Sequence, residues 1–476
     1  MSTVLSEALR KVIAEHSVVV AHLAKDTSID RTTLQHIIGG RRSPNKSQID
    51  KILYHIPIPE HKKKMVFQAF EITTRGADRY QQQEKVKTVI EKIAFASAMK
   101  PSFTAPNVNG AATPNAEESE ELHGILAINN ALINIINQEE ESVSFFMPSH
   151  FPIFYDTLFV KYMTSQTLAV TCFFPMSNEE GGIIHDLEYC ESFIPFFASP
   201  KHSFRAYYMR EQSSLHDTSI IPFPYFVHTS KHVLLLSADM KHAILTGQET
   251  FVRIYGKKCR EFLNVASPLF LSPPLGDMIM FFPNKSSSKD VFAALENQPC
   301  FQYYLTEQII KKYAVPTSKE QAELVEKYTK YIHDMIQEPD LFSAFGQEGL
   351  DYFVETGYIA VWPPSLGKPL DVPDRIELLE RMLHDIKNDV FHCRLVDASK
   401  FTIPRPTVTI AIRRKTLFVQ VLDYKGGNVK NICLSEKNIV DAFSDFLANL
   451  PDTNLIHSKK ETVRAFETAL ERLKVL

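Results

Sequence analysis

The stretch Ala21–Pro44, AHLAKDTSIDRTTLQHIIGGRRSP, contains two short segments with helical spacing of apolar residues, separated by a turn. The second segment runs from Arg31 to Ile38. Asp30 is well placed to cap its start, and the two glycines at 39 and 40 are suited to end it. This stretch therefore predicts a pair of short helices joined by a tight turn.

Helical patterns continue on both sides of this pair. An apolar stripe at helical spacing begins at Leu5, and Asn45 with Gln48 three residues later has the form of a capping box at the start of a further helix. A helix that stops at Gly76 follows, and a last one ends near Met99. We therefore expect residues 1–99 to form an all-α domain.

The order and spacing of these features resemble the Cro/repressor (Xre-type) helix-turn-helix family. In that family a Leu-Ala pair lies in the second helix, a β-branched residue follows the turn, and the recognition helix carries Ser or Thr and then aliphatic residues before an arginine-rich turn and a proline. The matching residues are Leu23, Ala24, Ile29, Thr33, Leu34, Ile37, Arg41, Arg42 and Pro44. The match covers roughly Leu5 to Leu53, about a tenth of the chain, and implies DNA binding through residues 31–38.

The residue types after Asp30 fit that role. The candidate DNA-binding residues are Arg31, Thr32, Thr33, Gln35, His36, Arg41, Arg42 and Lys46. Arginine can bond guanine and glutamine can bond adenine in bidentate fashion, whereas cations that follow the recognition helix are suited to phosphates. The sequence departs from the family in two places: Val18–Val20 replace a polar start of the second helix, and Ser28 replaces the common turn glycine, where a positive φ carries strain.

The rest of the chain has a different pattern. The sequence from 100 to 118 contains three prolines and no periodicity, which predicts a flexible linker. In residues 119–285 helices and strands alternate, which favours an α/β domain on a largely parallel sheet. Residues 286–476 predict an α+β domain, with a strand at Tyr358–Val361 and an antiparallel pair at Thr407–Ile412 and Thr416–Leu422.

Residues Glu120 to Ser267 resemble a degenerate, non-catalytic half of the phospholipase D fold, as found in some regulators that sense small ligands. The resemblance lies in the order of elements up to the hairpin YFVHTSKHVLLLS and the helix after it. Catalysis in that family needs His-x-Lys, whereas His228 and Lys231 are three residues apart. Several aromatic pairs between Phe145 and Tyr225 could line an apolar effector pocket, although most should be core.

Composition narrows the class of protein. Residues 1–100 hold 17 Lys and Arg against 10 Asp and Glu, a net charge of +7, which leaves −11 for the rest of a chain whose total is −4. A basic N-terminal module suggests a polyanionic partner. The six cysteines form no C-x-x-C pair, so we expect buried thiols and no metal or cofactor. The apolar runs are too short to span a membrane and the N-terminal segment has no signal-peptide core, so a cytoplasmic protein is expected.

These features predict a sequence-specific DNA-binding transcription regulator, not an enzyme. We expect a homodimer that binds double-stranded DNA and whose body senses a small-molecule or peptide effector. Two alternatives stay open. The body could be an enzyme acting on a nucleic acid or metabolite, or the chain could be a protein-interaction scaffold, such as an antitoxin-like partner.

Overall fold

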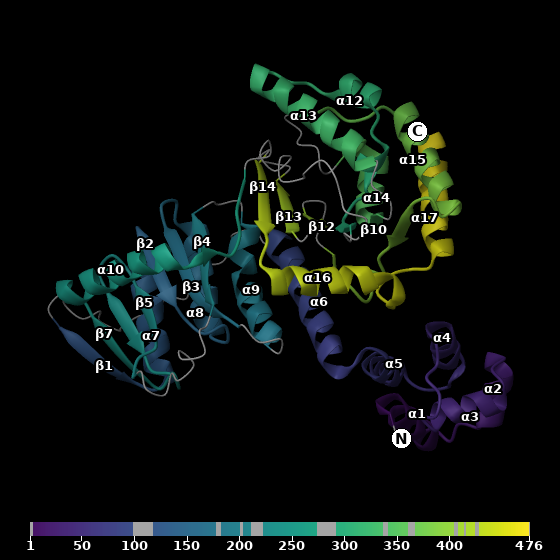
Figure 1. Ribbon diagram of the computed structural model, residues 1–476, viewed down its shortest axis with the longest axis horizontal. Helices are drawn as coiled ribbons and strands as arrows, with labels where there is room; N and C mark the ends of the chain where they lie inside the picture. Colours follow the sequence, from purple (N-terminus) through teal and green to yellow (C-terminus); the bar gives the residue numbers. More distant parts are fainter. Residues whose placement is uncertain are drawn as a thin grey trace. The chain divides into compact units, whose positions relative to one another are not determined.

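The computed structural model describes residues 3–98, 118–177, 182–199, 203–210, 222–273, 292–336, 341–359, 367–403, 408–413, 416–423 and 428–475. The chain forms two compact units, Met1–Glu84 and Lys85–Leu476, called here the N-terminal unit and the body (Figure 1). Of the expected linker, only Glu118 lies within the described residues. The expected division of the chain after residues 99, 118 and 285 stays a prediction.

Helices make up the N-terminal unit in the part of it that the structure describes. They are α1 Val4–Glu15, α2 Val20–Thr27, α3 Arg31–Ile38, α4 Lys46–His55, α5 Glu60–Arg75 and the start of α6 Ala77–Ala98, which continues into the body. The apolar stripes of α1 to α5 meet in one core, in which Leu9, Leu34 and Ile49 are completely buried. The expected helices are thus present, and α3 has the predicted bounds.

The first sheet of the body is mixed rather than largely parallel. Its strand order is β1-β7-β6-β5-β2-β3-β4-β8, and only the pairs β2–β3 and β3–β4 are parallel. Its strands are β1 Ser119–His123, β2 Ser142–Phe146, β3 Ala169–Met176, β4 Phe204–Arg210, β5 Tyr225–His228, β6 Val233–Leu236, β7 His242–Thr246 and β8 Ser267–Pro268. The strands that alternate with helices, β2, β3 and β4, are parallel as expected. The sheet as a whole is mixed because β5 pairs with β2 in the antiparallel direction and β6 and β7 continue that antiparallel part.

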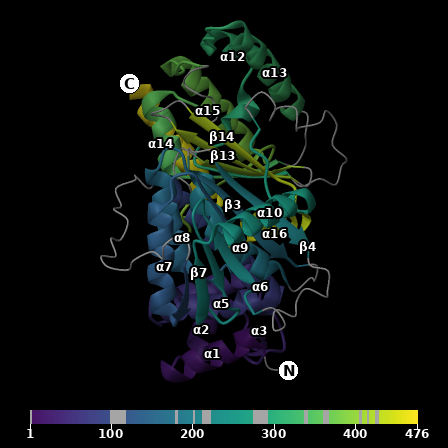
Figure 2. The same cartoon turned by 90° about the vertical axis from the view of Figure 1, so that its left-hand side faces the viewer.

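Helices cover this sheet on both faces (Figure 2). Because successive strand side chains point to opposite faces, Cys172 and Phe174 pack with α7 Ile125–Gln138, α8 Pro152–Thr164 and α9 Ile183–Ala198, whereas Phe173 packs with α10 Glu249–Val265. Many of the aromatic side chains noted in the sequence pack between this sheet and its helices. Phe145, Phe154 and Phe193, for example, are completely buried in the first of them.

The second sheet has the order β11-β10-β9-β12-β13-β14. Its strands are β9 Phe292–Glu296, β10 Leu341–Phe345, β11 His392–Leu395, β12 Val408–Arg413, β13 Thr416–Asp423 and β14 Asn428–Leu434. The first three are parallel, and β12, β13 and β14 form an antiparallel meander that includes the expected pair. This half of the body is therefore α+β, as expected.

The helices of this half are α12 Glu307–Tyr313, α13 Lys319–Ile336, α14 Gln347–Thr356, α15 Val372–Lys387, α16 Lys437–Asn449 and α17 Lys459–Val475, with short 3-10 helices at Phe301–Tyr304 and Leu450–Asp452. The strand expected at 358–361 is not seen at its first two residues, and the other two lie outside the described residues. Gly357 turns the chain at φ 76° after α14, and the carbonyl of Tyr358 accepts a bond from the side chain of Gln298 instead of a neighbouring strand.

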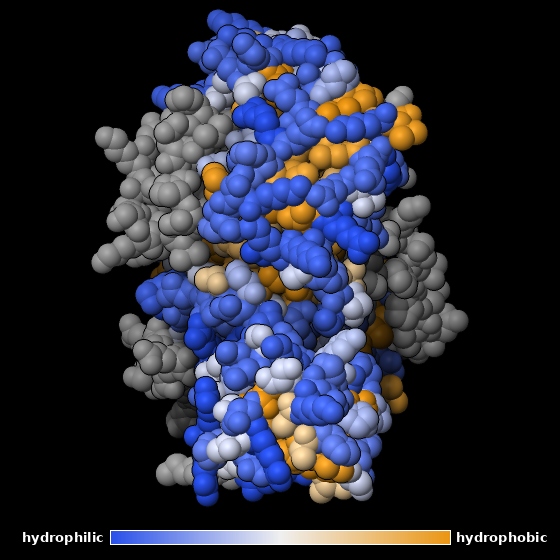
Figure 3. Space-filling model, turned by 90° about the vertical axis from the view of Figure 1, so that its right-hand side faces the viewer, coloured by the Kyte–Doolittle hydropathy of each residue, from blue (hydrophilic) through white to orange (hydrophobic). Residues whose placement is uncertain are grey.

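Three further observations bear on function. All six cysteines are buried free thiols, as expected. In the part of the chain that the structure describes, no helix combines the length and apolar character needed to cross a membrane. On the face shown in Figure 3, hydrophilic side chains predominate and hydrophobic ones gather in separate areas, a common distribution for a folded protein surface.

Candidate nucleic-acid interface

The turn between α2 and α3 is held by its own side chains. The Thr27 hydroxyl donates a hydrogen bond to the Leu23 carbonyl at 2.7 Å and accepts one from the Ile29 amide at 3.4 Å. Ser28 has φ 54°, so the positive φ expected at this position is confirmed. A non-glycine residue there is strained, and the burial of Leu23 and Ile29 on either side offsets this cost.

Helix α3 presents its polar side chains outward. The Asp30 carboxylate accepts a hydrogen bond from the Thr33 amide at 3.0 Å, which fixes the first turn. Leu34 and Ile37 are buried, and Arg31, Thr32 and Gln35 are exposed, with Thr33 and His36 half-buried. The first-turn side chains are therefore available to a ligand.

A tight C-terminal cap sets the direction of the chain after α3. Gly40 has φ 74°, its amide donates to the Ile37 carbonyl at 3.1 Å, and the Arg41 amide donates to the His36 carbonyl at 2.8 Å. This pair of bonds is a Schellman motif. The next residue, Arg42, is exposed like Arg41, and its Nη1 donates to the Thr33 hydroxyl at 3.5 Å. The loop cation thus lies beside the first turn of α3.

The capping box expected at the start of α4 is present. The Asn45 side chain accepts from the Gln48 amide at 2.9 Å, and the Gln48 side chain accepts from the Asn45 amide at 3.1 Å. This reciprocal pair positions Lys46, which is half-buried as the first residue of α4. Four of the candidate residues, at 31, 41, 42 and 46, are therefore cations on α3, on the loop after it or at the start of α4.

Two features of this region could not be read from the sequence. Arg10 of α1 donates from Nε to the Ile38 carbonyl at 3.2 Å and so binds the free carbonyl end of α3. This contact joins residues far apart in the chain. On α4, the Tyr54 side chain is 80% exposed, an unusual position for a large aromatic residue. No pattern in the sequence around Tyr54 predicted whether its side chain would be buried or exposed.

The β5–β6 turn contains His228 and Lys231, the two residues compared above with the His-x-Lys pattern. His228 is half-buried, its Nε2 lies 3.0 Å from the Val252 carbonyl, and burial lowers its pKa. Lys231 is exposed. The two side chains therefore lie in different environments, and this arrangement does not resemble a catalytic pair.

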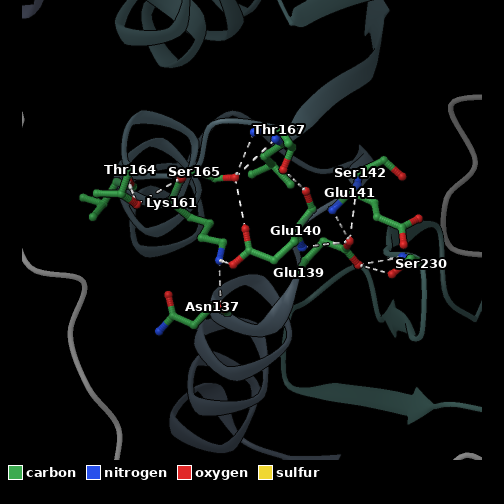
Figure 4. Close-up of polar contacts among 12 residues, drawn as sticks. Asn137, Glu139, Glu140, Glu141, Ser142, Lys161, Thr164, Ser165, Thr167 and Ser230 are labelled. Carbon is green, nitrogen blue, oxygen red and sulfur yellow. Dashed lines mark hydrogen bonds and ion pairs between the residues drawn. The ribbon is translucent and has the colours of Figure 1, made fainter.

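The carboxylate of Glu139 lies beside the β5–β6 turn and links it to neighbouring segments through hydrogen bonds (Figure 4). Glu139 Oε1 accepts from the amides of residues 140, 141 and 142, and Oε2 accepts from the amide and the hydroxyl of Ser230, both at 2.7 Å. Burial alone would raise the pKa of Glu139, but these hydrogen bonds outweigh it and lower the pKa. Next to it, Glu140 pairs with Lys161 of α8, whose Nζ also donates to the Asn137 carbonyl. The cluster joins α7, α8, β2 and the β5–β6 turn.

Metal chemistry finds no support in the described residues, which bring together no group of three or more His, Cys, Asp or Glu side chains suited to a metal ion. The eight candidate residues of the N-terminal unit stay a prediction.

No known family profile matches the chain, and no curated protein matches it. Among solved structures, it is similar to TrmBL2, described as an archaeal chromatin protein with a novel mode of DNA binding, at 11% identity over 46% of this chain and 86% of that one, with a TM-score of 0.24. It is also similar to a phosphatidylserine synthase of Haemophilus influenzae Rd KW20, at 9% identity over 76% and 94% of the two chains, with a TM-score of 0.25.

A third similar structure is a polyphosphate kinase from Porphyromonas gingivalis, at 8% identity over 74% of this chain and 56% of that one, with a TM-score of 0.22. One of the three proteins binds DNA and two are named as enzymes. Similarity this distant does not decide between these functions for the present chain.

Proposed function

We propose that the N-terminal unit is a helix-turn-helix domain of the Cro/repressor kind and that the chain is a sequence-specific, DNA-binding transcription regulator rather than an enzyme. The observation that carries the proposal is the exposed first turn of α3, with Arg31, Thr32 and Gln35 pointing to solvent while Leu34 and Ile37 anchor the helix to the core. A helix held in this way can enter the major groove with its N-terminal residues toward the bases.

The residue types on this turn fit base recognition. Arg31 can donate two bonds to guanine, Gln35 can pair with adenine, and the methyl group of Thr32 can contact thymine. Thr33 and His36, which are half-buried, would contribute at the edge of the same surface.

The cations after α3 fit the DNA backbone. Arg41 and Arg42 are exposed and Lys46 begins α4, so all three would reach phosphates on either side of the groove and fix the register of α3. The N-terminal unit holds 13 Lys and Arg against 9 Asp and Glu, a net charge of +4. This excess favours association with a polyanion.

A single unit of this kind reads a short half-site, so a useful specificity needs two copies. We therefore propose a homodimer in which the body carries the dimer contacts and a regulatory site. This part of the proposal rests on the geometry of DNA recognition and not on a contact of the described residues.

Selection of bound fragments from random double-stranded DNA tests the proposal, with the full chain, Arg31→Ala, Gln35→Ala and a control, Lys64→Ala, at an exposed position on α5. The first two variants should each lose roughly 1 to 3 kcal/mol on the preferred site and relax the preference at one base pair. The control should keep that preference. Equal binding to every fragment, unchanged in both variants, would refute sequence reading by α3.

Loss of a phosphate contact should change DNA binding differently from loss of a base contact. Arg41→Ala should weaken binding to all fragments alike and reduce the slope of log affinity against log salt by about one. If the full chain binds no DNA but retains a protein from a cell extract through α3, the scaffold alternative is favoured instead.

A further inference from the structure

One face of the first sheet of the body carries a row of four polar side chains, called here the polar row. Ser144 of β2 lies opposite His228 of β5 and opposite Thr171 of β3, and Thr171 in turn lies opposite Arg205 of β4. Each of the four lies two residues from an aromatic side chain that packs on the α10 side of the sheet, so the polar row points to that side. Arg205 is exposed and the other three are half-buried. The polar row is therefore accessible from solvent.

Helix α10 lies across this side of the sheet (Figure 1). It covers the aromatic side chains next to the polar row, and the ring centroids of Phe262 and Phe173 are 5.3 Å apart. A Cβ on Gly256 would lie 3.3 Å from His228 Nε2 and 3.8 Å from Arg260 Nη1. The missing side chain at Gly256 thus lets α10 approach the polar row and brings the Arg260 guanidinium close to it.

Three cations form a row on α10 beside the polar row. Arg253, Lys257 and Arg260 are four and three residues apart, so they share one side of the helix, and all three are exposed. Burial lowers the pKa of His228, and the positive charge of Arg260 lowers it further. Arg260 therefore joins the cations of α10 to the polar row, at whose other end lies Arg205.

The positive charge of this surface contrasts with the acidic body. The body carries a net charge of −8, because the chain carries −4 and the N-terminal unit +4. Helix α10 nevertheless holds four Lys and Arg against two Glu. Glu261 pairs with Lys257 at 3.6 Å, but both are exposed and such pairs are weak. Glu139 raises the pKa of His228, but its two oxygens already accept five hydrogen bonds from neighbouring groups.

We propose that the α10 face, which consists of the polar row with Arg253, Lys257 and Arg260, binds the sugar–phosphate backbone of a nucleic acid. Arginine and lysine pair with phosphates, and hydroxyl groups such as those of Ser144 and Thr171 donate hydrogen bonds to them. The cations of α10 extend over about 10 Å of helix axis and the polar row over about 14 Å. Phosphates of one strand follow one another every 3.4 Å or about that along a duplex axis, so the α10 face can contact several of them.

The arrangement of α10 favours a nucleic acid over an anionic membrane. Helices that lie in a membrane surface place apolar side chains in the lipid beside their cations. The exposed apolar side chains of α10, Phe251, Ile254 and Val265, lie about a third of a turn away from its row of cations. The cations are instead continuous with hydroxyl and imidazole groups. Backbone contact carries no sequence information, so this inference goes beyond the proposed reading of bases by α3 and does not depend on it.

The test measures binding of the full chain to a short DNA duplex of mixed sequence by fluorescence anisotropy at several salt concentrations. The α10 variant combines Arg253→Gln, Lys257→Gln and Arg260→Gln. The matched control removes the same charge from exposed positions of α13 by combining Lys319→Gln, Lys327→Gln and Lys330→Gln. The α10 variant should reduce the slope of log affinity against log salt by about 2 to 3 and weaken binding at low salt roughly tenfold or more, and the control should leave the slope unchanged. The thermal transition of each variant monitors folding.

The outcomes separate this inference from the proposed function. Equal effects of the two triple variants, or an unchanged slope in the α10 variant, overturn the inference. Binding to phosphatidylserine vesicles that the α10 variant loses, with DNA binding unchanged, overturns it in favour of a membrane. If α10-dependent binding occurs but no fragment is preferred, the inference holds and sequence reading by α3 fails. If a preferred site exists but the α10 variant binds every duplex like the wild-type protein, sequence reading holds and the inference fails.

Discussion

Substitutions at Asp30, the N-cap of α3, can change the stability of this helix and its charge independently. Asp30 accepts the Thr33 amide at 3.0 Å and carries a negative charge at the end of the helix proposed to meet DNA. Asparagine caps helices about as well as aspartate, whereas alanine does not cap. Asp30→Asn therefore removes the charge and keeps the cap, and Asp30→Ala removes both.

The expected magnitudes differ between the two variants. Loss of the cap in Asp30→Ala should destabilise α3 by about 1 kcal/mol, because this bond satisfies one of the free amides of an eight-residue helix. Removing one negative charge about 7 Å from a phosphate in water is worth about 0.6 kcal/mol, or roughly threefold in affinity. Asp30→Asn should thus bind DNA about threefold more tightly at low salt and keep wild-type stability, and the gain should fade at high salt.

Hydrogen exchange of the α3 amides measures the first effect, and fluorescence anisotropy with the selected DNA site measures the second. Faster exchange in Asp30→Ala alone, with tighter binding in Asp30→Asn, is the expected pattern. If Asp30→Asn exchanges as fast as Asp30→Ala, the side-chain cap is not what holds the helix. If Asp30→Asn binds more weakly, the carboxylate contacts the DNA and the assignment of first-turn roles is wrong.

Three further predictions concern stability and can be checked by urea unfolding. Ser28→Gly should stabilise the N-terminal unit by about 0.5 kcal/mol because it relieves a positive φ, whereas Gly40→Ala should cost about 1 to 2 kcal/mol for the opposite reason; equal effects of the two would contradict this explanation. Glu139→Ala should cost about 3 to 5 kcal/mol, since five donors lose their acceptor. The folded-state pKa of Glu139 is lowered, so this difference should be complete near neutral pH and shrink as pH falls below about 4.5; a constant difference down to pH 3 would be the contrary result. Glu191 of α9 pairs with Lys85 Nζ at 2.5 Å and with Lys92 Nζ at 2.7 Å, both on α6. Glu191→Gln should therefore destabilise the body by about 1 kcal/mol at low salt and less at high salt, and an effect independent of salt would show that these contacts do not stabilise it electrostatically.

The sequence predicted best where structure is local. The helices of the N-terminal unit have their own caps and apolar stripes, so α3 was predicted with its bounds and the capping box at Asn45 was found. The same holds for β12 and β13, whose pairing follows from a short connection between two alternating runs. Such signals lie within a few residues of the element that they define.

What was missed depends on distant partners. Strand β1, with the polar sequence SEELH, has mostly exposed side chains and exists because it pairs with β7, more than a hundred residues later. The mixed character of the first sheet likewise follows from the antiparallel β2–β5 pair, which no local pattern marks. In the candidate site, the contact from Arg10 to the end of α3 and the hydrogen bond between Arg42 and Thr33 arise from the packing of separate segments.

The burial of the cysteines gives the two units different reactivity. All six thiols lie in the body, between Cys172 and Cys433, and burial raises the pKa of each one. Since thiolates react with alkylating reagents and thiols hardly do, the folded body should resist alkylation, and each modified cysteine would report the opening of its own element. The N-terminal unit contains no cysteine. A single cysteine introduced on its surface would therefore accept a label selectively in the native protein.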